Sequence, residues 1–79
     1  MSTTEFLTVL HKRPFEPIRI EVSDGTSYDI RHPEMVIPTM TAAYIGIPTK
    51  QGRGFERVDI VSMEHIVKLL PLPAAAASA

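Results

Sequence analysis

Residues 18–34 read IRIEVSDGTSYDIRHPE, and this stretch decides the fold class. Its apolar side chains alternate with polar ones on both sides of SDGT (23–26), which is the pattern of two strands that each bury one face. SDGT itself is typical of a tight turn, because Gly25 is free to take a positive φ. The stretch therefore predicts a β-hairpin. The positions expected to face inward are Ile18, Ile20, Val22, Tyr28 and Ile30.

The alternation breaks at RHPE, directly after the hairpin. Pro33 has no amide hydrogen to donate, so the chain must form a bend, a bulge or a sheet edge there. Arg31 and Glu34 bracket this proline and are expected to pair across it. We therefore predict that Arg31, His32, Pro33 and Glu34 form an assembly or bend-forming element and not a catalytic one.

The rest of the chain predicts one helix and further short strands. STTE at residues 2–5 is a capping box, and the apolar spacing after it predicts a helix over 3–11. For residues 63–70, periodicity leaves both a last strand and a helix open. The other segments are strands near 35–37, 42–47 and 55–62, and a loop over 48–54.

Short antiparallel strands in a small chain avoid exposed edges best by curling into a barrel. We therefore predict a mainly β fold, in which an N-terminal short helix is followed by a five-stranded antiparallel small barrel. The helix and barrel form one domain over residues 1–72, and the alanine-rich residues 73–79 form a disordered tail.

A chain of 79 residues without cysteine has few means of stabilising itself. A domain of this size buries only about 60–65% of its unfolded surface, so tight packing or oligomerisation is expected. The lack of cysteine fits a cytoplasmic location. No apolar run approaches the ~20 residues of a membrane-spanning helix, and no signal-peptide pattern is present, so no membrane contact is predicted. A net charge of -1 argues against nucleic-acid binding by bulk charge alone.

The sequence carries no motif for catalysis, a metal or a cofactor. His11, His32 and His65 are far apart in the chain, whereas metal ligands usually come at short local spacing. There is no cysteine nucleophile, and no serine lies in a Gly-x-Ser-x-Gly elbow. We therefore expect neither an enzyme nor a bound cofactor.

Three segments resemble the bacterial Hfq family of Sm-like RNA chaperones in the order of their elements. EFLTVLHKR (5–13) resembles the family's N-terminal helix with its basic end, and IRIEVSDGTSYDI (18–30) resembles its first hairpin. VDIVSMEHIVKLLP (58–71) resembles its last two strands. The resemblance implies an Sm-like or SH3-like barrel that forms homo-oligomeric rings of six or seven through its edge strands. RPFEPIRIEVSDGTSYDIRHPE (13–34) also resembles a set of short bacterial proteins of unassigned function.

Two function classes remain open. The first, implied by the resemblance, is an Sm-like homo-oligomer that binds RNA in a regulatory role. The second is a protein-interaction or scaffold module of the same fold, without nucleic acid, whose edge strands would add a partner strand. If RNA is bound, the local cations and the turn histidine predict contacts at Lys12, Arg13, Lys50, Arg53 and His65.

Overall fold

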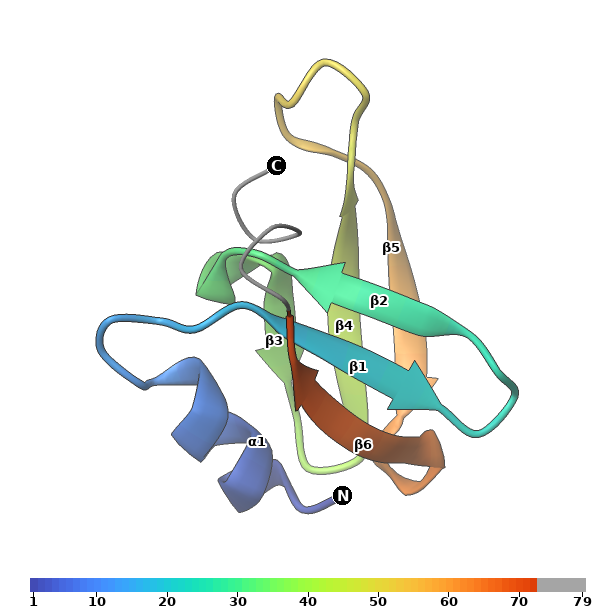
Figure 1. The fold of residues 1–79 in the computed structure, drawn as a ribbon. Helices are drawn as coiled ribbons and strands as arrows, with labels where there is room; N and C mark the ends of the chain where they lie inside the picture. The colour runs from blue at the N-terminus through green and yellow to red at the C-terminus, as the bar shows by residue number, and fades with distance from the viewer. Residues whose placement is uncertain (73–79) are drawn as a thin grey trace.

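Residues 1–72, the part of the chain that the computed structural model describes, form one helix and six strands (Figure 1). The predicted tail, 73–79, lies outside the described residues. Two 3-10 turns, η1 (Pro33–Met35) and η2 (Met63–His65), join β2 to β3 and β5 to β6. The helix is α1 (Thr3–Leu10), and the strands are β1 (Ile18–Val22), β2 (Ser27–Ile30), β3 (Val36–Pro38), β4 (Ala42–Pro48), β5 (Phe55–Ser62) and β6 (Ile66–Pro71).

Helix α1 begins as its capping box predicts. The Ser2 hydroxyl oxygen accepts from the Glu5 amide, and the same hydroxyl donates to the Glu5 carboxylate, both at 3.1 Å. The first contact satisfies the Glu5 amide, which the first turn of a helix leaves without a partner, and the second holds the two side chains together. Phe6 and Leu10 lie on the buried side of the helix. The predicted helix over 3–11 is confirmed to within one residue.

The hairpin of β1 and β2 is also confirmed. Ile18 pairs with Ile30 and Ile20 with Tyr28, so the alternating apolar positions share one face. In the turn, Gly25 takes a φ of 91°, which only glycine adopts without strain. An Asx turn supports it, because the Asp24 carboxylate accepts from the Thr26 amide at 2.9 Å.

The prediction of a five-stranded barrel is wrong. Within residues 1–72, six strands form two three-stranded antiparallel sheets, β2-β1-β6 and β3-β4-β5, and neither closes into a barrel. One cause is the η1 turn, where the Met35 amide donates to the His32 carbonyl at 3.1 Å. Since Pro33 cannot donate to a strand ladder, the chain stops at β2 and resumes as β3 in the other sheet.

A second corner has the same effect between β5 and β6. At η2 the Ser62 hydroxyl accepts from the Glu64 amide at 3.3 Å, and the Met63 amide donates to the Thr41 carbonyl at 2.9 Å. The chain therefore leaves the β3-β4-β5 sheet and returns to pair with β1. Of the two alternatives for residues 63–70, the structure contains the strand, preceded by one 3-10 turn.

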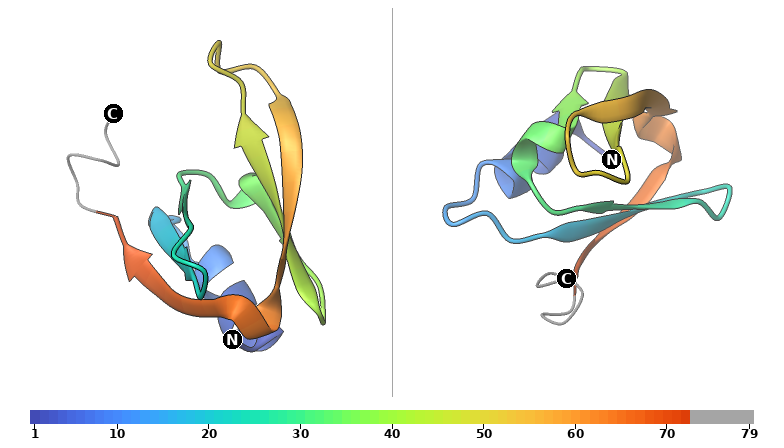
Figure 2. Two further views of the ribbon diagram at one scale, coloured as in Figure 1. Left: turned by 90° about the vertical axis from the view of Figure 1, so that its right-hand side faces the viewer. Right: turned by 90° about the horizontal axis from the view of Figure 1, so that it is seen from above.

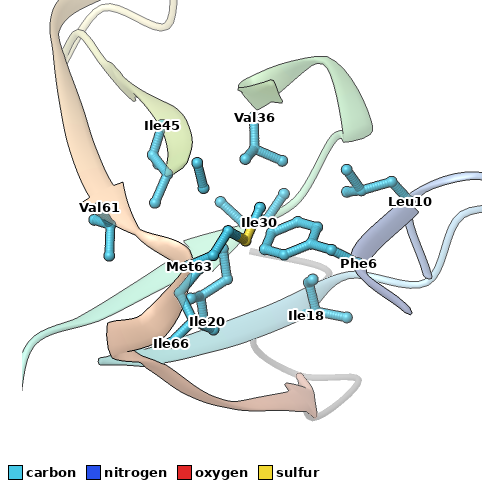
Figure 3. Packing of buried hydrophobic residues seen from close by; sticks show 11 residues of the cluster. Phe6, Leu10, Ile18, Ile20, Ile30, Val36, Ile45, Val61, Met63 and Ile66 are labelled. Atoms are coloured by element: carbon cyan, nitrogen blue, oxygen red, sulfur yellow. The ribbon is translucent and has the colours of Figure 1, made fainter. Parts of the chain in front are cut away.

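The core lies between the two sheets, and α1 closes one end of it (Figure 2). Each fully buried large apolar side chain contributes about 1.5–3 kcal/mol to folding. The largest ones come from the helix and from both sheets, so all three share one core (Figure 3). They are Phe6, Ile20, Ile30 and Ile45.

Among the strands within residues 1–72, β4 and β5 form the longest pairing, and their hairpin extends past the other sheet (Figure 2). Its register runs from Ala42 opposite Ser62 to Pro48 opposite Phe55. A bulge between Ile47 and Pro48 shifts the register by one residue. The outer half of this hairpin therefore lies beyond the core and is free to present side chains to a partner.

Candidate interaction surface

The five residues predicted to contact RNA lie at three separate places (Figure 1). Lys12 and Arg13 follow α1, Lys50 and Arg53 belong to the β4–β5 loop, and His65 ends η2. The fold does not bring them into one basic surface.

Two of these cations have structural partners beside the helix. Lys12 forms an exposed ion pair with Glu16, with 2.9 Å between Nζ and Oε1. Arg13 donates to the carbonyls of Leu10, at 3.4 Å, and of Lys12, at 3.1 Å. Carbonyls at the end of a helix lack partners and carry partial negative charge, so a guanidinium there caps the helix. The basic run after α1 is thus accounted for without a ligand.

His65 ties the β1–β2 turn to η2. Its carbonyl accepts from the Ser23 amide at 2.8 Å, and its Nδ1 lies 3.2 Å from the Ser23 hydroxyl. Both residues border a hollow of about 330 Å³ that also includes Asp24 and Val61. These contacts of His65 link the β1–β2 turn to η2. This structural role accounts for His65 without a ligand.

The RHPE segment meets the β4–β5 loop. Arg31, His32 and Glu34 line a hollow of about 360 Å³ together with Gly52 and Gly54. This juxtaposition arises because η1 packs against β4, a contact that no pattern in the sequence predicts. The assembly role of RHPE stays a prediction, which light scattering of Arg31→Ala and Glu34→Ala variants tests.

The outer surface of the β3-β4-β5 sheet carries exposed apolar side chains on all three strands. Ile37 pairs with Tyr44, and Tyr44 pairs with Ile60, so the three form a row across the sheet. Val58 and Phe55 extend this row toward the β4–β5 loop. Their exposed fractions are 65% for Ile37, 38% for Tyr44, 47% for Phe55, 55% for Val58 and 65% for Ile60. We call these five residues the apolar face.

The outer surface of the β2-β1-β6 sheet carries more charged residues. Arg19 pairs with Asp29 and Glu21 pairs with Lys68, so all four charged residues share the solvent side. The Arg19 guanidinium donates to both oxygens of the Asp29 carboxylate, at 2.7 and 3.3 Å. On β6, Leu70 pairs with Arg19 and Val67 is also exposed, so this surface mixes charged and apolar residues as small domains generally do. The outer surface of the β3-β4-β5 sheet is apolar on all three strands.

The polar residues of β5 explain why its apolar ones face outward. Tyr28 donates its hydroxyl hydrogen to Asp59 at 2.8 Å, and Arg57 donates to the other Asp59 oxygen at 2.9 Å. Both hydrogen bonds lower the pKa of Asp59, and the bond from Arg57 has the larger effect. Burial is the largest cause that raises the pKa of Tyr28, and the hydrogen bond to Asp59 raises it further. Since Asp59 faces the other sheet, strand alternation places Val58 and Ile60 on the outside.

The two edges of the β3-β4-β5 sheet are less suited to contact a partner than its apolar face. In an edge strand, inward-pointing charges and a bulge hinder pairing with a foreign strand, and β5 has both in Arg57, Asp59 and its register shift. The opposite edge, β3, is only three residues long and ends at Pro38. The apolar face is therefore the surface of this sheet that is best suited to contact a partner.

A hollow of about 490 Å³ lies between α1 and β6. Val9, Ile18 and Leu69 supply apolar walls, and Lys12 and Glu16 border it. The ion pair of Lys12 with Glu16 already satisfies these two charges, so they do not select a charged ligand.

The described residues offer no metal-binding cluster of three or more His, Cys, Asp or Glu side chains. Over the same range, no helix is long and apolar enough to cross a membrane. No family model matches the chain, and the searches of curated proteins and of solved structures found no significant match. The chain's own geometry is therefore the basis for a functional proposal.

Proposed function

We propose that the protein is a protein-interaction module whose binding surface is the apolar face of the β3-β4-β5 sheet. The observation that carries this proposal is the row of exposed apolar side chains across all three strands of this sheet, whereas the outer surface of the other sheet has charged pairs and exposed apolar residues only on β6. The cores of protein interfaces are depleted in charged residues, and contiguous exposed apolar patches mark interaction sites. A cytoplasmic location is part of the proposal and is supported by the absence of cysteine.

Two aromatic residues suit the role of anchors. Tyr44 lies on the central strand, and Phe55 lies beside the loop at the end of the hairpin. Aromatic side chains are enriched among the few interface residues that contribute most of a binding energy. The neighbouring Ile37, Val58 and Ile60 would exclude water around them, as the less critical residues of an interface do.

RNA binding has weaker support. Affinity for RNA rests largely on several phosphate contacts made together. The predicted cations are dispersed, and Lys12 and Arg13 already have partners within the chain. Aromatic rings that could stack on bases are present on the apolar face, but no cation of the predicted set belongs to that face.

Site-specific photo-crosslinking in cells tests the interaction face. A photoreactive residue replaces Val58 on the apolar face or, as the matched control, Val67 on β6. The two valines are equally exposed, at 55%, but lie on different sheets. We expect a discrete adduct from position 58 and none from position 67.

The adduct must depend on the surrounding apolar side chains. We expect Ile60→Lys to abolish it, because a buried charge without a partner costs several kcal/mol. Equal labelling from positions 58 and 67, or no adduct from either, would remove the proposal.

A further inference from the structure

We infer that the partner on the apolar face is a second copy of this chain, packed face to face with its strands antiparallel to those of the first copy. The inference rests on the proposed function, since it names the occupant of the same surface. It concerns a dimer formed by sheet faces, in contrast to a ring formed by sheet edges.

The apolar face is complementary to itself. The row of Ile37, Tyr44 and Ile60 is centred on the middle strand, so a twofold axis near Tyr44 would lay apolar side chains of one copy on those of the other. At the regular pairing positions of β3, β4 and β5 on this side, no charged residue occurs. A second copy can therefore approach without placing like charges in the middle of the contact.

Charges at the two ends of the sheet choose the orientation. The β4–β5 loop carries Lys50 and Arg53 and no acidic residue, whereas η2 at the other end carries Glu64. Parallel packing would bring two cationic loops together, whereas antiparallel packing brings each loop toward the partner's η2. Like charges close together are unfavourable, so the antiparallel arrangement is preferred.

Two further charges limit this electrostatic term. Glu56 lies near the cationic loop, and the Met1 amino group lies 3.3 Å from the Met63 carbonyl in η2. The end charges therefore set the orientation of the two copies more than their affinity, as interface charges at a rim generally do.

The size of the face predicts a weak dimer. Three strands about 4.8 Å apart and seven residues at about 3.3 Å each span about 300 Å² per copy, or about 600 Å² for both. Stable interfaces bury about 1,200–2,000 Å² in total, so we expect a Kd in the micromolar to millimolar range.

Sedimentation equilibrium on the purified chain tests the second copy. From about 10 µM to about 1 mM, we expect the mass to rise from 8.8 kDa toward twice that value. Val58→Lys should weaken the dimer at least about tenfold, because it buries an unpaired charge. Val67→Lys, at an equally exposed valine of the other sheet, should leave the dimer unchanged. Circular dichroism verifies that both variants are folded.

The absence of cysteine makes the orientation measurable with single-cysteine variants. Gln51→Cys and Met40→Cys keep every charge and place a thiol at the loop end and at the η2 end of the sheet. Equal amounts of the two chains, one of them tagged, are mixed and treated with a short bifunctional maleimide. We expect the mixed product to exceed the sum of the two homotypic products, which random pairing would only equal. A mixed product no larger than that sum would overturn the antiparallel arrangement.

The outcomes separate this inference from the proposed function. A folded wild-type chain that stays at 8.8 kDa up to about 1 mM overturns the second copy. If Val58 then still forms an adduct with a different protein, the interaction face stands and only its occupant is wrong. If neither a dimer nor an adduct forms, both ideas are wrong.

Discussion

The ring of Phe55 lies over Gly46 on the neighbouring strand. A Cβ atom at position 46 would stand 2.8 Å from three ring carbons, closer than such atoms ever pack. Glycine within a strand often marks a close approach of this kind, and an aromatic ring that covers it restores part of the lost packing. The relationship places an aromatic side chain at the loop end of the apolar face.

This contact predicts that Gly46 and Phe55 are energetically coupled. In the wild type, Gly46→Ala displaces the half-exposed ring, so the gain of about 0.5–1 kcal/mol that alanine brings to a strand interior is offset. In a Phe55→Ala background the ring is absent, and we expect the full gain. Urea unfolding of the four chains measures the coupling. Equal effects of Gly46→Ala in both backgrounds would show that the ring does not matter.

The inward charges of β5 predict protection against edge-to-edge association. Replacing Arg57 and Asp59 together by valine turns residues 57–61 into an uninterrupted apolar run on an edge strand, which is the pattern of aggregation-prone segments. We expect this double variant to scatter light and to form large species at concentrations where the wild type does not.

A matched control separates the effect of inward-facing charges on β5 from a general loss of charge. Arg19 on the central strand β1 and Asp29 on the edge strand β2 also form an ion pair, but both face the outer surface of their sheet. The Arg19→Val/Asp29→Val variant loses the same formal charges from the charged outer surface. If it aggregates as readily as the β5 variant, edge protection by Arg57 and Asp59 is not the explanation.

Much of the local structure was predictable because each signal lies within a few residues. The capping box of Ser2 and Glu5 begins the helix, and Gly25 supplies the turn of the first hairpin. The bend at Pro33 follows from a missing amide hydrogen. These features depend on covalent geometry and on hydrogen bonds between close neighbours in the chain, so a few adjacent residues are enough to predict them.

The sheet arrangement and the interaction face depend on long-range contacts that periodicity does not encode. Alternation in the sequence places Val58 and Ile60 on the same side of a strand, but it does not show whether that side faces the core or solvent. In the structure, Tyr28 on the other sheet donates to Asp59, so Asp59 faces inward and the two apolar residues face outward. The contact of RHPE with the β4–β5 loop likewise depends on how η1 packs against β4. The barrel prediction is wrong because the bend at Pro33 moves the chain from one sheet to the other, and the sequence pattern does not distinguish such a bend from a bulge or a sheet edge.

The carboxylates of three aspartates predict loss of stability in acid. The hydrogen bond from Arg19 is the largest cause that lowers the pKa of Asp29, and those from Thr26 and Arg57 lower the pKa of Asp24 and Asp59. A carboxyl whose folded pKa is depressed stabilises the fold above its unfolded pKa, and that contribution is lost as the pH falls through the folded value. We therefore expect the Tm to fall steadily below about pH 4.

Asp29 and its partner allow this assignment to be checked. Asp29→Asn removes the titrating group, so the Tm should be lower near neutral pH and should fall less in acid. Arg19→Gln removes the largest cause of the shift and should flatten the same part of the curve. Thermal unfolding followed by circular dichroism between about pH 7 and about pH 2 makes the comparison. If the Tm of both variants falls with pH in parallel with that of the wild type, the Arg19–Asp29 pair does not cause the loss of stability in acid.

The dispersed cations predict that any RNA binding is weak and only slightly dependent on salt. Each place brings together at most two of the predicted contacts, Lys12 with Arg13 or Lys50 with Arg53. For single strands, log K falls with log salt by about 0.7 per phosphate contact, so we expect a slope no steeper than about -1.4. The Kd should lie in the nonspecific range of about 10⁻⁴–10⁻⁶ M.

Fluorescence anisotropy of a labelled single-stranded RNA over a salt series measures this slope. Lys50→Ala/Arg53→Ala and Lys12→Ala/Arg13→Ala should each affect binding independently, because the two groups lie far apart (Figure 1). All five predicted contacts acting together would give a slope of about -3.5, since each phosphate contact adds about 0.7. A slope near that value, lost in either double variant, would mean that assembly joins the separate cations into one basic surface. RNA binding would then replace protein interaction as the better-supported function.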